Sequence, residues 1–209
     1  SAFAQALAWP AGGTTPPGSP AGSATKSIAV LPFVNLSTDP ENEYFTDGIA
    51  EEIINALNKI QALRVASRTS SFAFKGKQAD VGEIGRKLKV GTVLEGSVRK
   101  AGSRLRVTAQ LVNVADGFQL WSERYDRQLE DVFAIQDEIA ENIVKALRVV
   151  LSPEEKRQIE KPPTENVEAY DYYLRGRQLF HRFRRTSILL ARRRSERAIE
   201  ADAHYALAH

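Results

Sequence analysis

One short apolar run constrains the fold more than any other part of this 209-residue chain. Residues 27–33 read Ser-Ile-Ala-Val-Leu-Pro-Phe, without a charged side chain, and the proline ends the run as a strand. A strand that is apolar on both faces is typical of the centre of an α/β sheet, where helices cover both sides. The sequence therefore predicts a buried central strand here.

The residues that follow change repeatedly between helical and strand periodicity. Helices are predicted after Thr46 or Asp47, either of which could be the N-cap, and over 80–88 and 131–151. Further strands are predicted at 63–67, 92–98, 104–113 and 119–125. The strict alternation in 104–113 indicates an antiparallel strand with one apolar and one polar face, and 119–125 is expected to be the next strand of the meander. The expected order is β-α-β-α-β-β-β-α, an α/β fold with a mixed sheet of about five strands covered by helices.

The two ends of the chain differ from this central part. Residues 1–25 are uncharged and rich in proline and glycine, which is typical of a flexible linker. Residues 164–209 predict two antiparallel helices and the start of a third, the pattern of a helical repeat. The predicted organisation is a linker at 1–25, an α/β domain at 26–151 and a truncated all-α tail at 164–209. Because the chain contains no methionine, we expect it to be part of a larger protein.

Composition argues against several kinds of catalytic site. The chain has no cysteine, which removes disulfides, thiol catalysis and thiolate metal ligands. Its three histidines, at 181, 204 and 209, all lie in the tail, so the main domain cannot hold a Ser-His-Asp triad. The glycine-rich motifs that cradle phosphate are also missing. The sequence therefore predicts a module that is not an enzyme and carries no cofactor or metal.

One segment has the chemistry of a small-ligand site. Ser67, Arg68, Thr69, Ser70 and Ser71 follow a predicted strand and supply four hydroxyls and a guanidinium. A loop of this kind at the carboxyl end of a parallel strand could hold an anion. The alternative is a turn whose hydroxyls satisfy its own backbone.

A second candidate is an apolar stripe for protein contacts. Ile135, Ile139, Ile143 and Leu147 recur at helical spacing along 131–151. We expect this broad face to pack on the sheet and to leave a stripe for a protein partner, including a second copy in a homodimer.

The tail is strongly basic. Residues 175–197 contain nine arginines and one acid, Glu196. Such a segment could meet nucleic acid or acidic lipid, but the solvated face of two helices is the favoured interpretation, and nucleic-acid binding is not expected. No apolar run approaches the roughly 20 residues that a membrane-spanning helix needs, so no membrane insertion is expected within this chain.

Several blocks of sequence carry a resemblance to a known family. They are Ile28-Ala-Val-Leu-Pro-Phe33, Tyr44-Phe-Thr-Asp-Gly-Ile49, Ser67-Arg-Thr-Ser-Ser-Phe72, Val93-Leu-Glu-Gly-Ser-Val98, Arg106-Val-Thr-Ala-Gln-Leu111 and Leu120-Trp-Ser-Glu-Arg-Tyr125. In this order they closely resemble the TolB-like amino-terminal domain of bacterial signalling proteins, over about residues 26–150. The tail resembles a degenerate tetratricopeptide repeat, with Ala191 and Ala198 at the spacing of the second-helix alanines.

The resemblance implies a role in signalling. In that family the domain often follows a nucleotide cyclase, a winged-helix DNA-binding domain or a kinase, and often precedes tetratricopeptide repeats. It implies a non-catalytic regulatory or protein-interaction module, with any cyclase activity in an upstream domain. The alternative is a small-ligand sensor, for an anion or a nucleotide, that controls such an output domain. A periplasmic location is expected if a membrane helix precedes the linker, and a cytoplasmic one otherwise.

Overall fold

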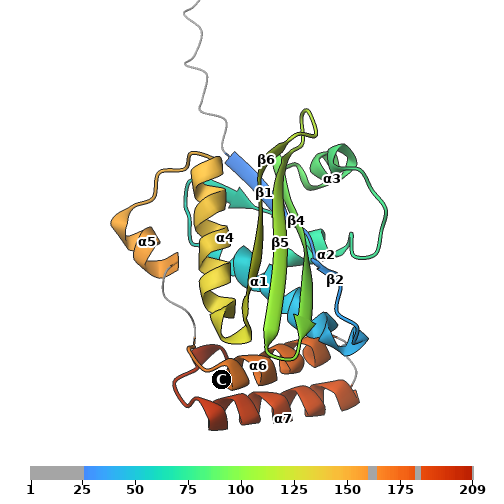
Figure 1. The fold of residues 1–209 in the computed structure, drawn as a ribbon, viewed down its shortest axis with the longest axis vertical. Coiled ribbons are helices and arrows are strands. Elements are labelled where there is room, and N and C mark those ends of the chain that lie inside the picture. The colour runs from blue at the N-terminus through green and yellow to red at the C-terminus, as the bar shows by residue number, and fades with distance from the viewer. Residues whose placement is uncertain (1–25, 160–163, 182–184, 209) are drawn as a thin grey trace, which may run out of the picture.

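The fold is a mixed α/β sheet covered by helices, with a pair of helices across one end (Figure 1). The computed structural model describes residues 26–159, 164–181 and 185–208. It confirms the predicted fold class, and the predicted linker at 1–25 lies outside the described residues. No helix among these residues combines the length and the apolar character needed to cross a membrane.

The elements alternate much as the sequence predicts. The strands are β1 (Lys26–Val30), β2 (Val34–Asn35), β3 (Leu63–Val65), β4 (Thr92–Ala101), β5 (Arg104–Asn113) and β6 (Gln119–Gln128). The α-helices are α1 (Glu43–Asn58), α2 (Arg68–Phe72), α3 (Val81–Leu88), α4 (Val132–Ala146), α5 (Pro153–Ile159), α6 (Val167–Phe180) and α7 (Arg185–Ala201). Three 3₁₀ turns are η1 (Pro40–Asn42), η2 (Leu129–Asp131) and η3 (Ala206–Ala208).

The sheet has the order β3-β1-β4-β5-β6, with β2 paired to β4. β1 pairs in parallel with both β3 and β4, whereas β4, β5 and β6 form an antiparallel meander. Ile28, Ala29 and Val30 of β1 are completely buried, which confirms the predicted central strand. β4 and β6 extend about three residues beyond the predicted ends, and the two-residue strand β2 was not predicted.

Two hydrophobic clusters lie on the two faces of the sheet. The larger one joins the inward residues of β5, namely Leu105, Val107, Ala109 and Leu111, to α1 and α4. The smaller one lies on the opposite face and includes Ile84 of α3. The alternation along β5 therefore separates a core face from a polar face, as predicted.

The start of α1 differs from the prediction. The helix begins at Glu43, and neither Thr46 nor Asp47 is its cap. The chain enters through the turn η1, where the Asp39 carboxylate accepts a hydrogen bond from the Glu41 amide at 2.8 Å. Because η1 runs directly into α1, the predicted cap residues fall inside the helix. The helix predicted at 80–88 is present as α3, and Asp80 caps it by accepting a hydrogen bond from the Glu83 amide at 2.7 Å.

The long helix predicted at 131–151 is too long by about one turn. α4 ends at Ala146, because Arg148 takes a left-handed conformation with φ of 51°. The Val149 amide then donates to the Val144 carbonyl at 3.0 Å, which closes a Schellman motif. Glycine usually occupies this position, so an arginine there gave no signal for the helix end.

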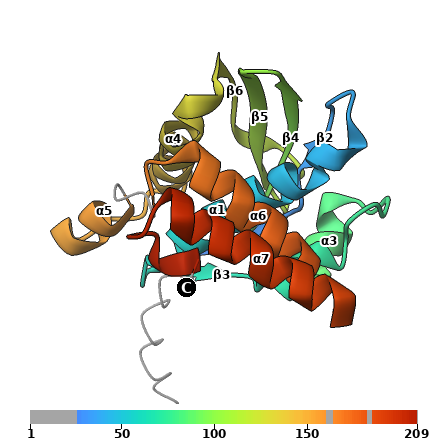
Figure 2. The ribbon, with the colours of Figure 1, turned by 90° about the horizontal axis from the view of Figure 1, so that it is seen from below.

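The helical tail lies across one end of the sheet and of α1 (Figure 2). α6 and α7 run antiparallel, and the Asn166 amide group at the start of α6 donates to the Ala201 carbonyl at the end of α7. Tyr170, Tyr173 and Leu174 of α6 belong to the same hydrophobic core as α1 and α4. The predicted third helix is represented by the turn η3. The tail therefore packs into the α/β core along α6.

Candidate interaction site at the α1–α6 junction

α1 and α6 approach each other closely where α1 has no side chain. A Cβ atom placed on Gly48 would lie 2.5 Å from Cδ2 of Leu174, far inside normal contact distance. Leu174 is 4% exposed, so its side chain fills the space that Gly48 leaves open. The glycine therefore sets the distance between the α/β domain and the tail.

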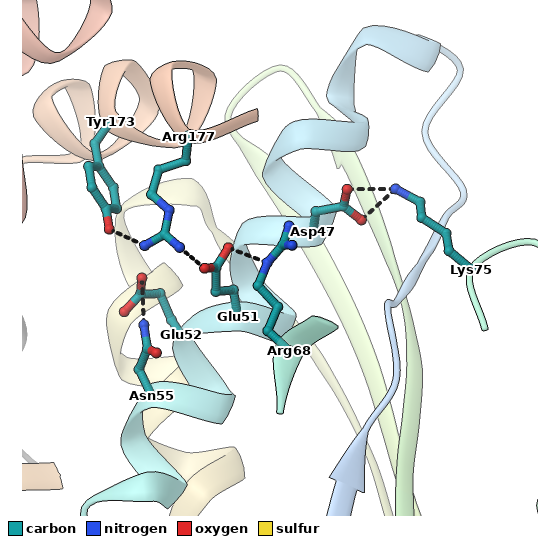
Figure 3. Close-up of polar contacts among 8 residues, drawn as sticks. All are labelled: Asp47, Glu51, Glu52, Asn55, Arg68, Lys75, Tyr173 and Arg177. Carbon is teal, nitrogen blue, oxygen red and sulfur yellow. Dashed lines mark hydrogen bonds and ion pairs between the residues drawn. The ribbon is translucent and has the colours of Figure 1, made fainter. Parts of the chain in front are cut away.

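Glu51 is the hub of the polar contacts at this junction (Figure 3). Its carboxylate, on a residue that is 6% exposed, forms ion pairs with Arg68 of α2, at 3.0 Å from Nε, and with the guanidinium of Arg177 of α6. Arg177 also donates to the Tyr173 hydroxyl at 2.7 Å. Burial lowers the pKa of both guanidinium groups, although each remains charged in the ordinary pH range. One carboxylate thus connects three helices.

A second carboxylate of α1 holds the chain that follows α2. Asp47 accepts two hydrogen bonds from Lys75 Nζ, at 2.7 Å on Oδ1 and 2.6 Å on Oδ2. Lys75 also lies 2.6 Å from Glu43 Oε1. Burial raises the pKa of Asp47, and the Lys75 charge opposes that shift. The segment after α2 is therefore attached to the same helix that contacts the tail.

The start of α1 makes another charged contact with α6. The Tyr44 hydroxyl donates to the Asp171 carboxylate, which also accepts from Arg175 Nε at 2.7 Å. The Arg175 guanidinium lies over the Tyr44 ring, 4.4 Å from its centroid. Burial, reinforced by Asp171, raises the pKa of the Tyr44 hydroxyl, so it remains a donor at neutral pH.

Aromatic side chains form the apolar half of the junction. Tyr170 is fully buried, and its ring meets Phe45 of α1 and Phe133 of α4 edge-on, with centroids 6.3 and 5.0 Å apart. Its hydroxyl accepts a hydrogen bond from Gln136 Nε2 at 2.8 Å. The Tyr170 ring of α6 therefore packs against both α1 and α4.

Residues 67–71 differ from the prediction in their secondary structure. The segment is not a loop, because Ser67 caps the short helix α2 by accepting from the Ser70 amide at 3.2 Å. Arg68 turns toward Glu51, and Ser71 is completely buried, whereas Thr69 is exposed. The hydroxyls of Ser67 and Ser70 lie 2.9 Å apart, but the Arg68 guanidinium is paired with Glu51 and Ser71 is buried. The anion site at these residues therefore stays a prediction.

The predicted interaction stripe on α4 is buried within the fold. Ile135, Ile139, Ile143 and Leu147 are all buried, with exposed fractions of 1%, 0%, 0% and 9%. The apolar face of α4 is used against the sheet and α1, so these four side chains leave no stripe for a partner.

Many arginines of the basic segment have partners within the fold. Arg175 and Arg177 bind Asp171 and Glu51, as described, and Arg192 pairs with Glu196 at 2.8 Å. Arg192 lies on an exposed helical face, as the sequence predicts, whereas Arg175 and Arg177 belong to the junction with α1. Among the described residues, no group of three or more histidine, aspartate or glutamate side chains is placed to hold a metal ion.

Sequence reasoning missed the main residues of this junction. In the sequence Glu51 closely follows the predicted N-cap, a position where a carboxylate ordinarily favours the helix dipole and needs no further partner. The signal that could have found the junction is the spacing of Tyr170, Tyr173 and Leu174, which places three large apolar side chains on one face of α6. Such a face needs a partner, and in the structure α1 and α4 supply it.

Comparison with known proteins places the chain in a family of regulators. Residues 24–142 match the family model described as the HilA/YgeH-like transcriptional regulator, second domain. This match covers more than half of the chain, and the chain belongs to that family.

One curated relative extends the similarity into the tail. The protein named "Putative adenylate cyclase 3" from Rhizobium meliloti (strain 1021) is 50% identical over 186 residues, which are 89% of this chain. The aligned region is 32% of the relative, so the chain spans about a third of that protein's length.

Three solved structures are similar at low sequence identity. TolB from Acinetobacter baumannii is 17% identical with a TM-score of 0.45, covering 61% of this chain and 29% of that one. Lipoprotein GNA1162 from Neisseria meningitidis is 16% identical with a TM-score of 0.44, covering 57% and 99%. The LpoB C-terminal domain from Salmonella enterica is 20% identical with a TM-score of 0.41, covering 50% and 83%.

Proposed function

We propose that this chain is a non-catalytic regulatory and protein-interaction module of a larger bacterial signal-transduction protein. The observation that carries the proposal is the double ion pair of Glu51 with Arg68 and Arg177. Through it, a partner that binds the tail and shifts α6 also displaces α2, which follows the sheet strand β3. The module would thus pass a contact on its tail to the α/β domain.

The relatives support a role in controlling an attached output domain. The matching family model describes the second domain of a transcriptional regulator. The curated relative named "Putative adenylate cyclase 3" is about three times as long as this chain. In this proposal the output domain is a nucleotide cyclase or a DNA-binding regulator. Any cyclase activity would belong to another part of such a protein.

The tail is proposed to be a degenerate tetratricopeptide repeat. Its two helices pack through small residues, as that repeat requires, since a Cβ on Gly176 would lie 3.2 Å from the Ala191 carbonyl oxygen. Ala198 is completely buried against the rest of the core. A single pair of helices forms no concave groove, so contacts through the outer surface of α7 are the relevant ones.

The outer surface of α7 offers apolar side chains to a partner. Leu189 and Leu190 are 58% and 48% exposed, whereas the neighbouring Ala191 is buried and faces α6. In the homodimer form of the proposal, two copies pair through this surface. Pairing two modules would bring two output domains together.

Sedimentation over a wide concentration range tests the homodimer form. The wild-type chain should associate, and a variant carrying Leu189→Gln and Leu190→Gln should remain monomeric at the same concentrations. Val150→Gln is the matched control, because Val150 is 87% exposed and lies outside the tail. A wild-type chain that is monomeric throughout, or a double variant that still associates, would contradict pairing through α7.

A further inference from the structure

A cleft of about 570 Å³ lies between α1, α4, α5, α6 and η3, and none of the functions above uses it. This volume is within the range of small-molecule sites. The residues that matter for its chemistry are Glu52, Asn55, Phe133, Gln136, Ile159 and Leu207. Figure 3 shows Glu52 on α1 next to Glu51, with the Asn55 side chain hydrogen-bonded to it.

The cleft contains a buried carboxylate that the fold leaves poorly satisfied. Glu52 is 8% exposed, and among the described residues its one hydrogen bond is a long contact of 3.4 Å from Asn55 Nδ2. Burial raises the pKa of this carboxyl, with Asn55 and the Lys59 charge opposing the shift. A desolvated carboxylate without a close counter-charge costs free energy, and a bound cation would recover it.

A second buried group adds an unused acceptor. Gln136 is 6% exposed and donates its side-chain NH₂ to the Tyr170 hydroxyl at 2.8 Å. Its carbonyl oxygen has no hydrogen-bond donor among the described residues. Glu52 and Gln136 therefore bring a charged and a neutral acceptor to the same cleft, and together they suit a group with several N–H donors.

The cations in the wall are engaged with other groups. Lys59 Nζ donates to the Gln158 carbonyl at 2.6 Å, and Arg177 binds Glu51 and Tyr173. Asp137 adds a second carboxylate to the lining, and His204 lies there as well. The negative charge of Glu52 thus has no ion-pair partner among the described residues.

The remaining wall is apolar. Phe133 and Ile159 are buried, and Leu207 is 49% exposed beside them. A ligand that satisfies Glu52 and also covers these side chains has a cationic head and an apolar body.

We propose that this cleft binds an organic cation with N–H donors, of the amidinium, guanidinium or ammonium class, with Glu52 as its counter-ion. The same chemistry is available from a small molecule and from an arginine side chain of a peptide. This proposal goes beyond the interaction function, since it requires neither a dimer nor a partner on α7.

Calorimetry on the 209-residue chain tests the proposal with two matched probes. Benzamidine carries the cation and benzamide is its neutral counterpart of the same shape. Benzamidine should bind at least about tenfold more tightly than benzamide. An N-acetyl-arginine amide probe carries the cation without the aromatic body. Its affinity shows how tightly the cleft binds the arginine side chain of a peptide.

Variants assign the binding to Glu52. Glu52→Gln keeps the shape and the contact with Asn55 but removes the charge, so it should weaken benzamidine binding at least about tenfold while circular dichroism stays unchanged. Glu154→Gln, at an exposed position of α5, should bind as the wild type does. Absence of benzamidine binding at millimolar concentration, equal binding of the two probes, or wild-type affinity in Glu52→Gln would overturn the proposal.

Discussion

Gly48 and Leu174 meet where α1 crosses α6, and the contact depends on the missing side chain. A Cβ on Gly48 would lie 2.5 and 2.6 Å from the two Cδ atoms of Leu174. Gly48 lies within residues 24–142, which match the regulator family, and Leu174 lies outside them in the tail. The two residues therefore mark the point at which the family domain and the tail become one packed structure.

Gly48→Ala should destabilise the chain although alanine favours helix. Alanine gains about 1 kcal/mol of helix propensity, but the added methyl group overpacks a buried contact and costs about 1–3 kcal/mol. We expect a net loss of about 1 kcal/mol in the free energy of unfolding, measured by urea denaturation.

A double-mutant cycle separates the two effects. Leu174→Ala alone should cost about 2–4 kcal/mol, because it removes a buried leucine. In that background Gly48→Ala should become neutral or stabilising, since the methyl group then has space. An equal penalty in both backgrounds would show that Gly48 and Leu174 do not set the approach of the helices.

Glu51→Gln should destabilise the chain by about 3 kcal/mol, because it leaves two partly buried guanidinium groups without their counter-charge. Chemical denaturation measures the loss. Glu141→Gln is the matched control, since Glu141 forms an exposed ion pair with Lys145 and should cost less than about 0.5 kcal/mol. Similar losses in the two variants would contradict the role of Glu51 as a hub.

His181 should make stability depend on pH. Burial, together with the charges of Arg68 and Arg177, lowers the pKa of its imidazole to about 4. In the unfolded chain the pKa is about 6.5, so between these values the unfolded state binds more protons. The contribution of neutral His181 to the free energy of unfolding is therefore complete above about pH 6.5, and it is lost as the pH falls toward 4.

His181→Gln should remove this part of the pH dependence. Its stability relative to the wild type should rise as the pH falls from about 6.5 to 4, because glutamine does not titrate. Urea denaturation at several pH values in that range measures the difference. If the free energies of unfolding of the two proteins change with pH in parallel, the lowered pKa of His181 is refuted.

Local patterns explain which parts of the fold are predictable. The apolar run at 27–33 favours a buried strand, and its residues 27–30 lie in β1. The alternation in 104–113 predicts which face of β5 meets the core. The end of α4 was missed because its left-handed residue is Arg148, where glycine is the usual signal. Short elements such as α2 depend on a single cap, so local sequence defines them weakly.

The contacts at the α1–α6 junction were harder to predict from the sequence, for a different reason. Glu51 and Arg177 are 126 positions apart, and no local pattern indicates that two such charges meet. A buried charge looks like a surface charge in the sequence until its partner helix is placed. Glu52 shows the same difficulty, since the order of the residues does not reveal that it lines a cleft.

Native-state hydrogen exchange along α1 and α6 tests most directly whether the tail is part of the α/β fold. If the junction joins them, amides of α6 near Tyr170 and Leu174 should open with the same free energy as amides of α1 near Ile53. That result would mean that the two helices unfold together. If α6 opens at a much lower free energy while α1 stays protected, the tail is an independent unit and the proposed coupling is wrong.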